Sequence, residues 1–248
     1  MTTSTGPVLV TGAAGFAGGH LLDLLSRERD PALAGPLVAW HRPGGAAPRE
    51  VPGVSWEPVE LLDRASVRAA LDRLRPSQLY HCAGAAHVGR SWQTTDVSFA
   101  INVRGTHHLL DALRRNGAST RVLVVSSAMV YASASRPLTE DDPLVPASPY
   151  ALSKLAQEMV STTDPNGPPA SIARAFNHFG PRQDPFFVAA GFARRIADIE
   201  AGRWEPEIAV GNLEARRDLT DVRDTVRAYR AIVERGQPGR AYNVCSGH

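Results

Sequence analysis

The 248-residue chain contains almost no lysine. Its 27 lysines and arginines comprise 26 arginines and one lysine (27 − 26 = 1), so Lys154 carries the only ammonium side chain. Cysteine is scarce as well: Cys82 and Cys245 match neither a disulfide framework nor the spacing of a metal site. We therefore predict a protein without a disulfide framework and without a metal site.

Long apolar runs and a strong charge imbalance are also missing. No stretch approaches the roughly 18 apolar residues of a membrane span, and residues 1–7 lack the basic and apolar regions of an export signal. The net charge is only +2, with arginines scattered among acidic residues, which argues against nucleic-acid binding. We predict a cytoplasmic protein that binds neither a membrane nor a nucleic acid.

Short apolar runs alternate with helical patterns along the first 175 residues. The predicted strands are 8–10, 37–40, 78–82, 121–125 and 170–174. The predicted helices are centred on 21–25 and cover 65–74, 99–116 and 151–160, followed by 188–201 and 221–234. This alternation is typical of βαβ units in a parallel sheet. We predict an α/β fold, with a Rossmann-type parallel sheet over residues 6–175 and a smaller, mainly substrate-binding part over residues 176–248.

A glycine-rich turn follows the first predicted strand. Gly12, Gly15 and Gly18 have the spacing G-x-x-G-x-x-G and lead into a helix. Glycines permit a tight turn and a close approach of backbone amides to a pyrophosphate, which then lies at the positive end of the helix. In this strand–turn–helix context the motif predicts a dinucleotide site.

The second predicted strand bears on the choice between NAD and NADP. An acidic residue at its end would hold the ribose 2′-hydroxyl of NAD, but residues 38–42 contain no carboxylate. Arg42, together with His41, is suited to the 2′-phosphate of NADP. The alternative is that Arg42 is a solvated loop residue and the protein discriminates poorly. We predict NADP, with NAD possible.

The single lysine lies four residues after a tyrosine. Tyr150 and Lys154 share one helix face at this spacing. The ammonium is then expected to favour the phenolate and to lower the pKa of Tyr150, which suits the tyrosine to proton transfer near neutral pH. The alternative is an ordinary surface lysine.

Together with the glycine turn and Tyr150-x-x-x-Lys154, the run 125–131 resembles the extended short-chain dehydrogenases/reductases that modify nucleotide sugars. Residues 176–183 and 211–224 look more narrowly like the GDP-mannose 4,6-dehydratase and GDP-4-keto-6-deoxymannose reductase branch. The resemblance spans essentially the whole chain. It implies an NAD(P)-dependent enzyme that acts on a nucleotide-diphosphate sugar as a homodimer.

The resemblance also implies roles for individual residues. Ser127 corresponds to the hydroxyl that binds the reacting sugar oxygen, Tyr150 to the proton donor or acceptor, and Lys154 to the group that also holds the nicotinamide ribose. Asn102 matches a family asparagine whose expected role is structural. Together with the glycine turn and Arg42 from the arguments above, the predicted cofactor-binding residues are Gly12, Gly15, Phe16, Gly18, Arg42, Leu62, Asp63, Ala83, Tyr150 and Lys154. The implied substrate-binding residues are Ser91, Ser127, Asn177, Arg182 and Arg217.

Asp63 has two possible roles, because it precedes a predicted helix. It can cap the helix N-terminus, or its carboxylate can accept a hydrogen bond from the adenine amino group. The resemblance favours the second role.

Met129 marks a departure from the dehydratase pattern. The 4,6-dehydratases carry a carboxylate two residues before the tyrosine equivalent to Tyr131, whereas methionine cannot accept a proton. The resemblance therefore implies NAD(P)-dependent reduction of the 4-keto group of a nucleotide-activated 6-deoxyhexose. The alternatives are a nucleotide-sugar 4-epimerase and, from another class, a non-catalytic NADP-binding sensor. Relatives continue beyond the stretch 242–248, so we also expect a C-terminally shortened substrate-binding part.

Overall fold

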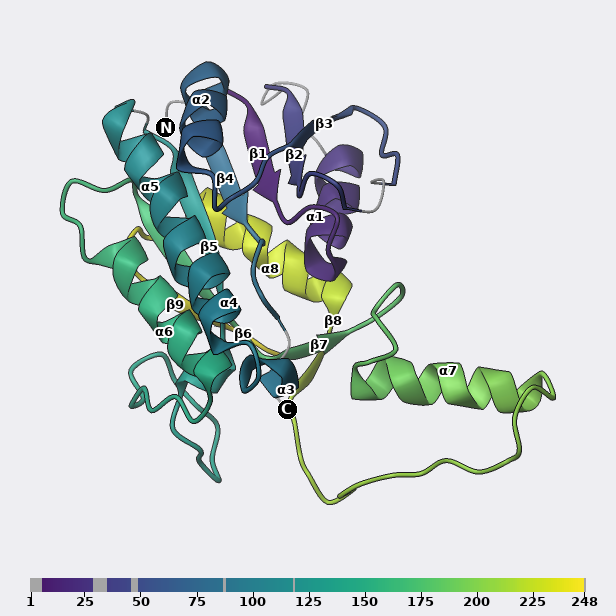
Figure 1. Cartoon of the computed structure of the whole chain (residues 1–248). Helices are drawn as coiled ribbons and strands as arrows, with labels where there is room; N and C mark the ends of the chain where they lie inside the picture. Colours follow the sequence, from purple (N-terminus) through teal and green to yellow (C-terminus); the bar gives the residue numbers. More distant parts are fainter. Residues whose placement is uncertain (1–5, 29–34, 46–48, 87, 118, 248) are drawn as a thin grey trace.

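The fold is shown in Figure 1 as a computed structural model that describes residues 6–28, 35–45, 49–86, 88–117 and 119–247. Within these ranges, seven strands form one parallel sheet. They are β1 (Val8–Thr11), β2 (Leu37–His41), β3 (Val54–Pro58), β4 (Gln78–His81), β5 (Arg121–Ser127), β6 (Ala170–Ala175) and β9 (Ala241–Val244). The longer helices are α1 (Phe16–Arg27), α2 (Arg64–Leu74), α5 (Thr106–Arg115), α6 (Pro149–Thr162), α7 (Val188–Glu200) and α8 (Val222–Arg235).

The strand order is β3-β2-β1-β4-β5-β6-β9, and every pairing in this sheet is parallel. The carboxyl ends of all strands therefore lie at the same edge. The direction of winding reverses between β1 and β4, and ligands of open α/β sheets bind outside the strand ends at such a point. The predicted α/β fold with a Rossmann-type sheet is confirmed.

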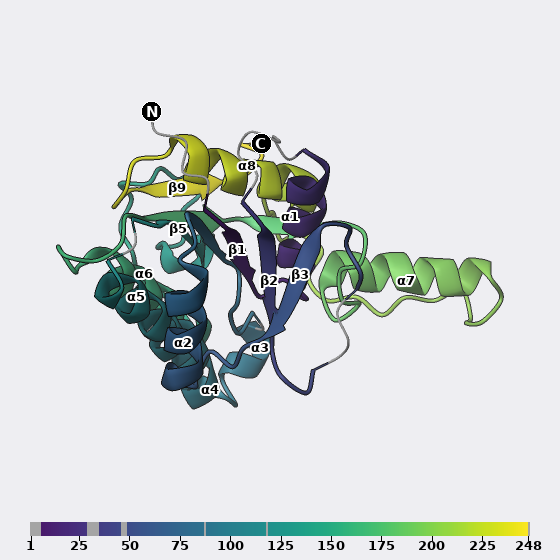
Figure 2. The ribbon, with the colours of Figure 1, turned by 90° about the horizontal axis from the view of Figure 1, so that it is seen from above.

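Helices cover both faces of the sheet. Helices α2, α5 and α6 lie on one face, and α1 and α8 pack side by side on the other (Figure 2). The arrangement is the three-layer form that βαβ crossovers of one hand produce. None of the described helices combines the length and the apolar character needed to span a membrane.

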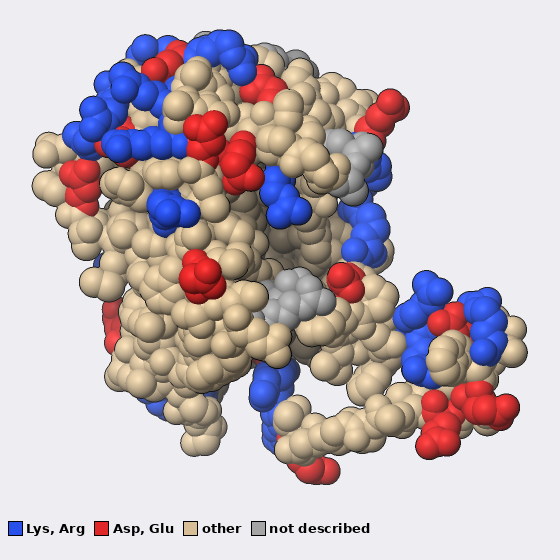
Figure 3. Space-filling model, in the orientation of Figure 1, with Lys and Arg blue, Asp and Glu red and all other residues tan. Residues whose placement is uncertain are grey.

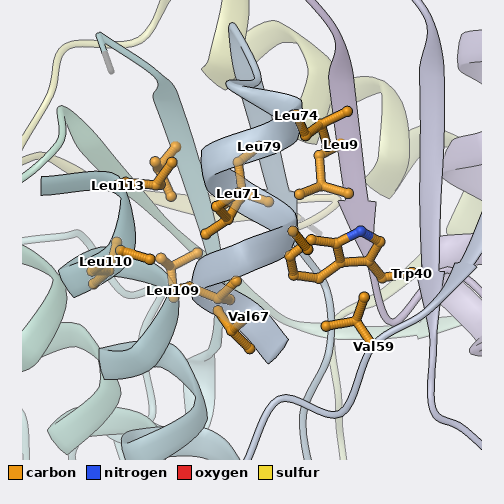
Figure 4. Close-up of a cluster of buried hydrophobic side chains, with 14 of the residues drawn as sticks. Leu9, Trp40, Val59, Val67, Leu71, Leu74, Leu79, Leu109, Leu110 and Leu113 are labelled. Atoms are coloured by element: carbon orange, nitrogen blue, oxygen red, sulfur yellow. The ribbon is translucent and has the colours of Figure 1, made fainter. Parts of the chain in front are cut away.

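The core between the sheet and α2–α5 is shown in Figure 4. Leu9 from β1 and Trp40 from β2 meet Leu71 of α2 and Leu109 of α5, and all four side chains are buried. Truncating a buried tryptophan to alanine lowers the free energy of unfolding by about 3–5 kcal/mol. The side chain of Trp40 alone therefore contributes a large part of the free energy of unfolding of a typical domain. The core fixes the sheet edge from which the site residues extend.

The chain after residue 175 contributes to two regions. Its last helix and strand, α8 and β9, return to the sheet body. Between them and β6, the short strands β7 (Asn177–Phe179) and β8 (Leu219–Asp221) pair with each other and carry an arm that contains α7. The arm projects from the body and leaves an opening beside it (Figure 3). A mainly substrate-binding role for residues 176–248 therefore concerns the arm, and it stays a prediction.

Candidate active site

The turn between β1 and α1 has room only for glycine at two positions. Gly12 adopts a φ of +65°, and a Cβ there would lie 2.5 Å from backbone atoms of Ala83. A Cβ at Gly18 would lie 2.3 Å from the backbone oxygen of Gly12. Gly15 is the N-cap of α1, and no side chain caps this helix. The turn therefore fits the pyrophosphate of a dinucleotide, which accepts hydrogen bonds from such helix-end amides.

A groove of about 280 Å³ lies beside the turn. Gly15 and Phe16 line it, together with two arginines, Arg49 and Arg182. Both arginines pair with Asp23 of α1, and Arg182 Nη2 lies 2.7 Å from Asp23 Oδ2. Burial raises the pKa of Asp23, but hydrogen bonds from the two arginines outweigh this effect and lower it. Arg49 was not identified from the sequence, because no motif marks it.

The remaining predicted cofactor residues surround this edge of the sheet. Arg42 is exposed directly after β2, so its contact with a 2′-phosphate stays a prediction. Asp63 caps α2, since its Oδ1 accepts from Ala65 N at 3.0 Å and Ser66 N at 3.2 Å. The capping role is thus confirmed, and the adenine contact stays a prediction. Leu62 donates its backbone N–H to Glu60, as part of the same loop.

Helix α6 brings the predicted proton-transfer residues into the core. The hydroxyl of Ser148 caps the helix by accepting from Ala151 N at 3.1 Å, and a proline occupies the first turn. Tyr150 is buried and shares a side-chain hydrogen bond with Ser127, which ends β5. The backbone N–H of Tyr150 donates to Ser91 Oγ at 3.2 Å. The structure thus brings Ser127, Tyr150 and Ser91 together, while a sugar contact by Ser91 stays a prediction.

Lys154 lies one helical turn after Tyr150 and is 5% exposed. Its Nζ donates to the backbone oxygen of Val125 at 2.9 Å and to Gln157 Oε1 at 2.8 Å. Burial lowers the pKa of Lys154 to about 8. It is therefore a buried residue, not the surface lysine of the alternative interpretation.

The prediction that this ammonium lowers the pKa of Tyr150 is wrong. Burial raises the pKa of Tyr150, and the hydrogen bond with Ser127 opposes this only in part. The physical reason is that the i, i+4 spacing places both residues on one face but does not direct Nζ at the phenol. The ammonium is held instead by Val125 and Gln157.

Asn102 lies in a π-helix, Ala100–Gly105, between α4 (Thr95–Phe99) and α5. Its Oδ1 accepts from Ala85 N at 2.8 Å, and its Nδ2 donates to Ser153 Oγ at 2.9 Å. A Cβ at Gly84 would lie 2.9 Å from Asn102 Oδ1 and 3.2 Å from Lys154 Nζ. Asn102 therefore fixes the backbone that follows β4 next to Lys154, which agrees with the structural role expected for it.

The predicted substrate residues of the arm are more scattered. Asn177 is exposed on β7, and Arg182 is paired with Asp23 at the groove. Among the described residues, Arg217 is exposed and donates to the neighbouring backbone oxygen of Arg216. The structure does not bring these three side chains together, so their contact with a diphosphate stays a prediction. Met129, in contrast, lies in the short 3-10 helix Ala128–Val130 directly after Ser127.

Known proteins share this architecture over nearly the whole chain. The chain is 35% identical to the GDP-6-deoxy-D-mannose reductase of Pseudomonas aeruginosa over 97% of its own length and 74% of that protein. It is 34% identical to a dTDP-glucose 4,6-dehydratase of Streptomyces griseus, over 97% of the chain and 73% of that protein. Sequence identity alone therefore does not separate a reductase from a dehydratase.

Comparison with solved structures also finds an enzyme of this kind. The structure of RMD from Pseudomonas aeruginosa complexed with NADPH matches with a TM-score of 0.82 and 33% identity, covering 98% of this chain and 76% of that one. The model of the NAD dependent epimerase/dehydratase family matches residues 8–245. With the glycine turn, the parallel sheet and the Ser127–Tyr150–Lys154 site in place, the chain belongs to the NAD dependent epimerase/dehydratase family.

Proposed function

We propose that the protein reduces the 4-keto group of a nucleotide-activated 6-deoxyhexose, GDP-linked, with NADPH. The observation that carries the proposal is the burial of Tyr150 and Ser127 at one corner, where the hydroxyl of Ser127 also accepts from the backbone N–H of Met129. The first two residues are equipped to act on a carbonyl oxygen. Met129 cannot act as the base that removal of water from the sugar requires.

Each residue of the site has a distinct task in a ketone reduction. Bound NADPH supplies the hydride. The raised pKa of Tyr150 keeps its hydroxyl protonated at neutral pH, so Tyr150 donates a proton to the carbonyl oxygen as negative charge develops there. Ser127 donates a hydrogen bond to the same oxygen and orients it. Lys154 contributes a positive charge at the same corner and an N–H for the ribose of the cofactor.

The cofactor would be held mainly by the glycine turn and by Ala83, Leu62 and Asp63 around the strand ends. NADPH is favoured by the arginines on this side: Arg42 follows β2, and Arg49 lines the groove beside the turn. No carboxylate occupies the described end of β2, where a ribose 2′-hydroxyl would need one. The NADPH-bound relative supports this preference.

The diphosphate of the sugar nucleotide is proposed to bind to Arg182, which lines the same groove, and to Arg217 and Asn177. Guanidinium groups suit phosphate oxygens because they form paired, charge-assisted hydrogen bonds. The proposal extends to a homodimer in the cytoplasm. Exposed apolar side chains on α6, Leu152 and Met159, support an interface on that helix.

Two incubations test the proposed reaction. With GDP-mannose and catalytic NADP we expect no 4-keto-6-deoxy product, because residues 128–129 hold no base. With the 4-keto-6-deoxy sugar nucleotide and NADPH we expect a reduced sugar and about one cofactor consumed per sugar. Tyr150→Phe, which removes only the hydroxyl, serves as the matched control and should lose at least ~10²-fold in turnover.

Three results would contradict the proposal. Dehydration of GDP-mannose would reveal a base elsewhere in the site. Inversion at C4 of a supplied nucleotide sugar, without net consumption of NADPH, would indicate a 4-epimerase. Tight binding of NADPH without turnover of any keto-sugar nucleotide would indicate a sensor.

A further inference from the structure

A continuous series of buried hydrogen bonds connects the end of β1 with Lys154. Thr11 Oγ1 lies 2.7 Å from His81 Nδ1, and His81 Nε2 lies 2.8 Å from Thr106 Oγ1. Gln157 Nε2 lies 2.8 Å from Thr106 Oγ1, and Gln157 Oε1 lies 2.8 Å from Lys154 Nζ. None of the five side chains is more than 5% exposed. Polar groups buried this completely are costly unless every one of them is satisfied.

The donors and acceptors of this series are consistent in one arrangement. An ammonium only donates, so Gln157 presents Oε1 to Lys154 and its NH₂ group to Thr106. Thr106 gives its one proton to the backbone oxygen one turn earlier, at 2.6 Å, and therefore accepts from both Gln157 and His81. His81 then carries its proton on Nε2 and accepts from Thr11 at Nδ1. Burial, with a smaller effect of the Lys154 charge, lowers the pKa of His81 to about 3, which keeps the ring neutral.

We propose that Gln157, oriented by Thr106, is a positioning residue that holds the ammonium of Lys154 in place for proton transfer and cofactor binding. Within the described residues, two of the three N–H groups of Lys154 have acceptors, the Val125 oxygen and Gln157 Oε1. The first acceptor is backbone within β5 and cannot turn away. Gln157 is therefore the side chain whose orientation decides where the remaining N–H group is available. This role rests on the proposed function of Lys154.

The charge state of Lys154 reports on this contact. The other titratable groups near the ammonium are His81 at the end of β4, Cys82 directly after it, and Tyr150 and Glu158 from α6. The carbonyl oxygen of Gln157 stabilises the protonated amine, and a carboxylate in its place would do so more strongly. An apolar side chain of similar length would remove this stabilisation of the protonated amine.

The single lysine makes the test direct. A lysine-free purification tag and [¹³Cε]-lysine labelling give one resonance, from Lys154, whose chemical shift is followed against pH. Gln157→Glu should raise the titration midpoint by roughly 1–3 pH units, the usual effect of an adjacent opposite charge. Gln157→Met should lower it by about one pH unit, since a hydrogen bond to the charged form is lost. The exposed Gln237→Glu adds the same charge elsewhere and should leave the midpoint unchanged.

The orientation by Thr106 is tested with a second pair of variants. Thr106→Val removes the hydroxyl at nearly constant volume, so the amide of Gln157 loses its partner and the midpoint should fall. Thr106→Ser keeps the hydroxyl and should keep the wild-type midpoint. Equal midpoints in both variants would overturn the role assigned to Thr106.

The outcomes for Gln157 separate positioning from a general structural effect. Opposite displacements in Gln157→Glu and Gln157→Met support the proposal. Unchanged midpoints, or displacements in the same direction, overturn it. Because the resonance is observed without substrate, the result is independent of which keto-sugar is turned over. Failure of the proposed reaction with displaced midpoints would refute the enzyme assignment and leave the contact intact.

Discussion

Replacement of the single lysine by arginine is the sharpest test of the site. Lys154→Arg keeps a positive charge but exchanges a compact ammonium for a broad planar fork. Lys154 is 5% exposed, and Nζ already donates to Val125 and Gln157. Nζ lies close to the backbone at Gly84, where even an added Cβ would come within 3.2 Å of it.

Two costs follow from this geometry. Enlarging a side chain in a closely packed site lowers the free energy of unfolding by about 1–3 kcal/mol. The guanidinium group of an arginine also cannot donate to both Val125 and Gln157 and at the same time direct a third N–H group as the ammonium does. Loss of a positioned acid/base arrangement lowers turnover by about 10²-fold or more, which corresponds to about 2.7 kcal/mol of transition-state stabilisation.

The assay is the steady-state rate of NADPH consumption with a 4-keto-6-deoxy sugar nucleotide, alongside chemical denaturation of the same samples. Lys154→Met, which removes the charge at similar length, is the matched variant and should be equally impaired. If Lys154→Arg remained folded and kept turnover within about threefold of wild type, charge alone would be sufficient. The argument that this chain retains its one lysine for its shape would then be refuted.

Three further outcomes follow from the site and its surroundings. Arg42→Ala should weaken NADPH binding by about 1–3 kcal/mol, the value of a charged hydrogen bond, and leave NADH binding unchanged; equal loss for both cofactors in a titration would contradict this role. Glu158→Gln should lower the free energy of unfolding by about 3–5 kcal/mol, because it leaves the guanidinium of Arg174 buried without its partner, and Glu158→Gln/Arg174→Met should recover part of the loss in chemical denaturation. Turnover in the reductive direction should fall as the pH rises through about 8, since burial lowers the pKa of Lys154 to that value and the ammonium exists only below it; a pH–rate profile flat from 7 to 9.5 would contradict it.

Elements with continuous apolar runs were predictable from the sequence. The predicted strands at 37–40 and 121–125 are buried on both faces, as parallel strands between helical layers are. Strand β3 was missed because it has no continuous apolar run and no fully buried residue, and because it ends in a proline at the sheet edge. The helix predicted over 99–116 forms as a π-helix followed by α5, and no periodicity distinguishes the two.

Site residues that belong to a sequence motif could be predicted. Contacts between residues that only the fold brings together could not. The roles carried over to Ser127, Tyr150 and Lys154 remain predictions, although the structure places these residues at one corner. Gln157 could have been noticed, because i, i+3 spacing puts it on the same helix face as Lys154. The pairing of Arg182 with Asp23 has no such signal, since the two lie 159 residues apart in the sequence.

The two sides of the site differ in how firmly their charged groups are held. Lys154 is enclosed by hydrogen bonds in the core, and moving its ammonium would leave buried acceptors unsatisfied. Arg182 is 41% exposed and paired with Asp23 across a groove open to solvent. Exposed ion pairs contribute about 0–1 kcal/mol, so Arg182 can exchange its carboxylate for a phosphate oxygen at little cost. The protein thus keeps the proton-transfer groups in one arrangement while the proposed phosphate-binding side chain remains free to change partners.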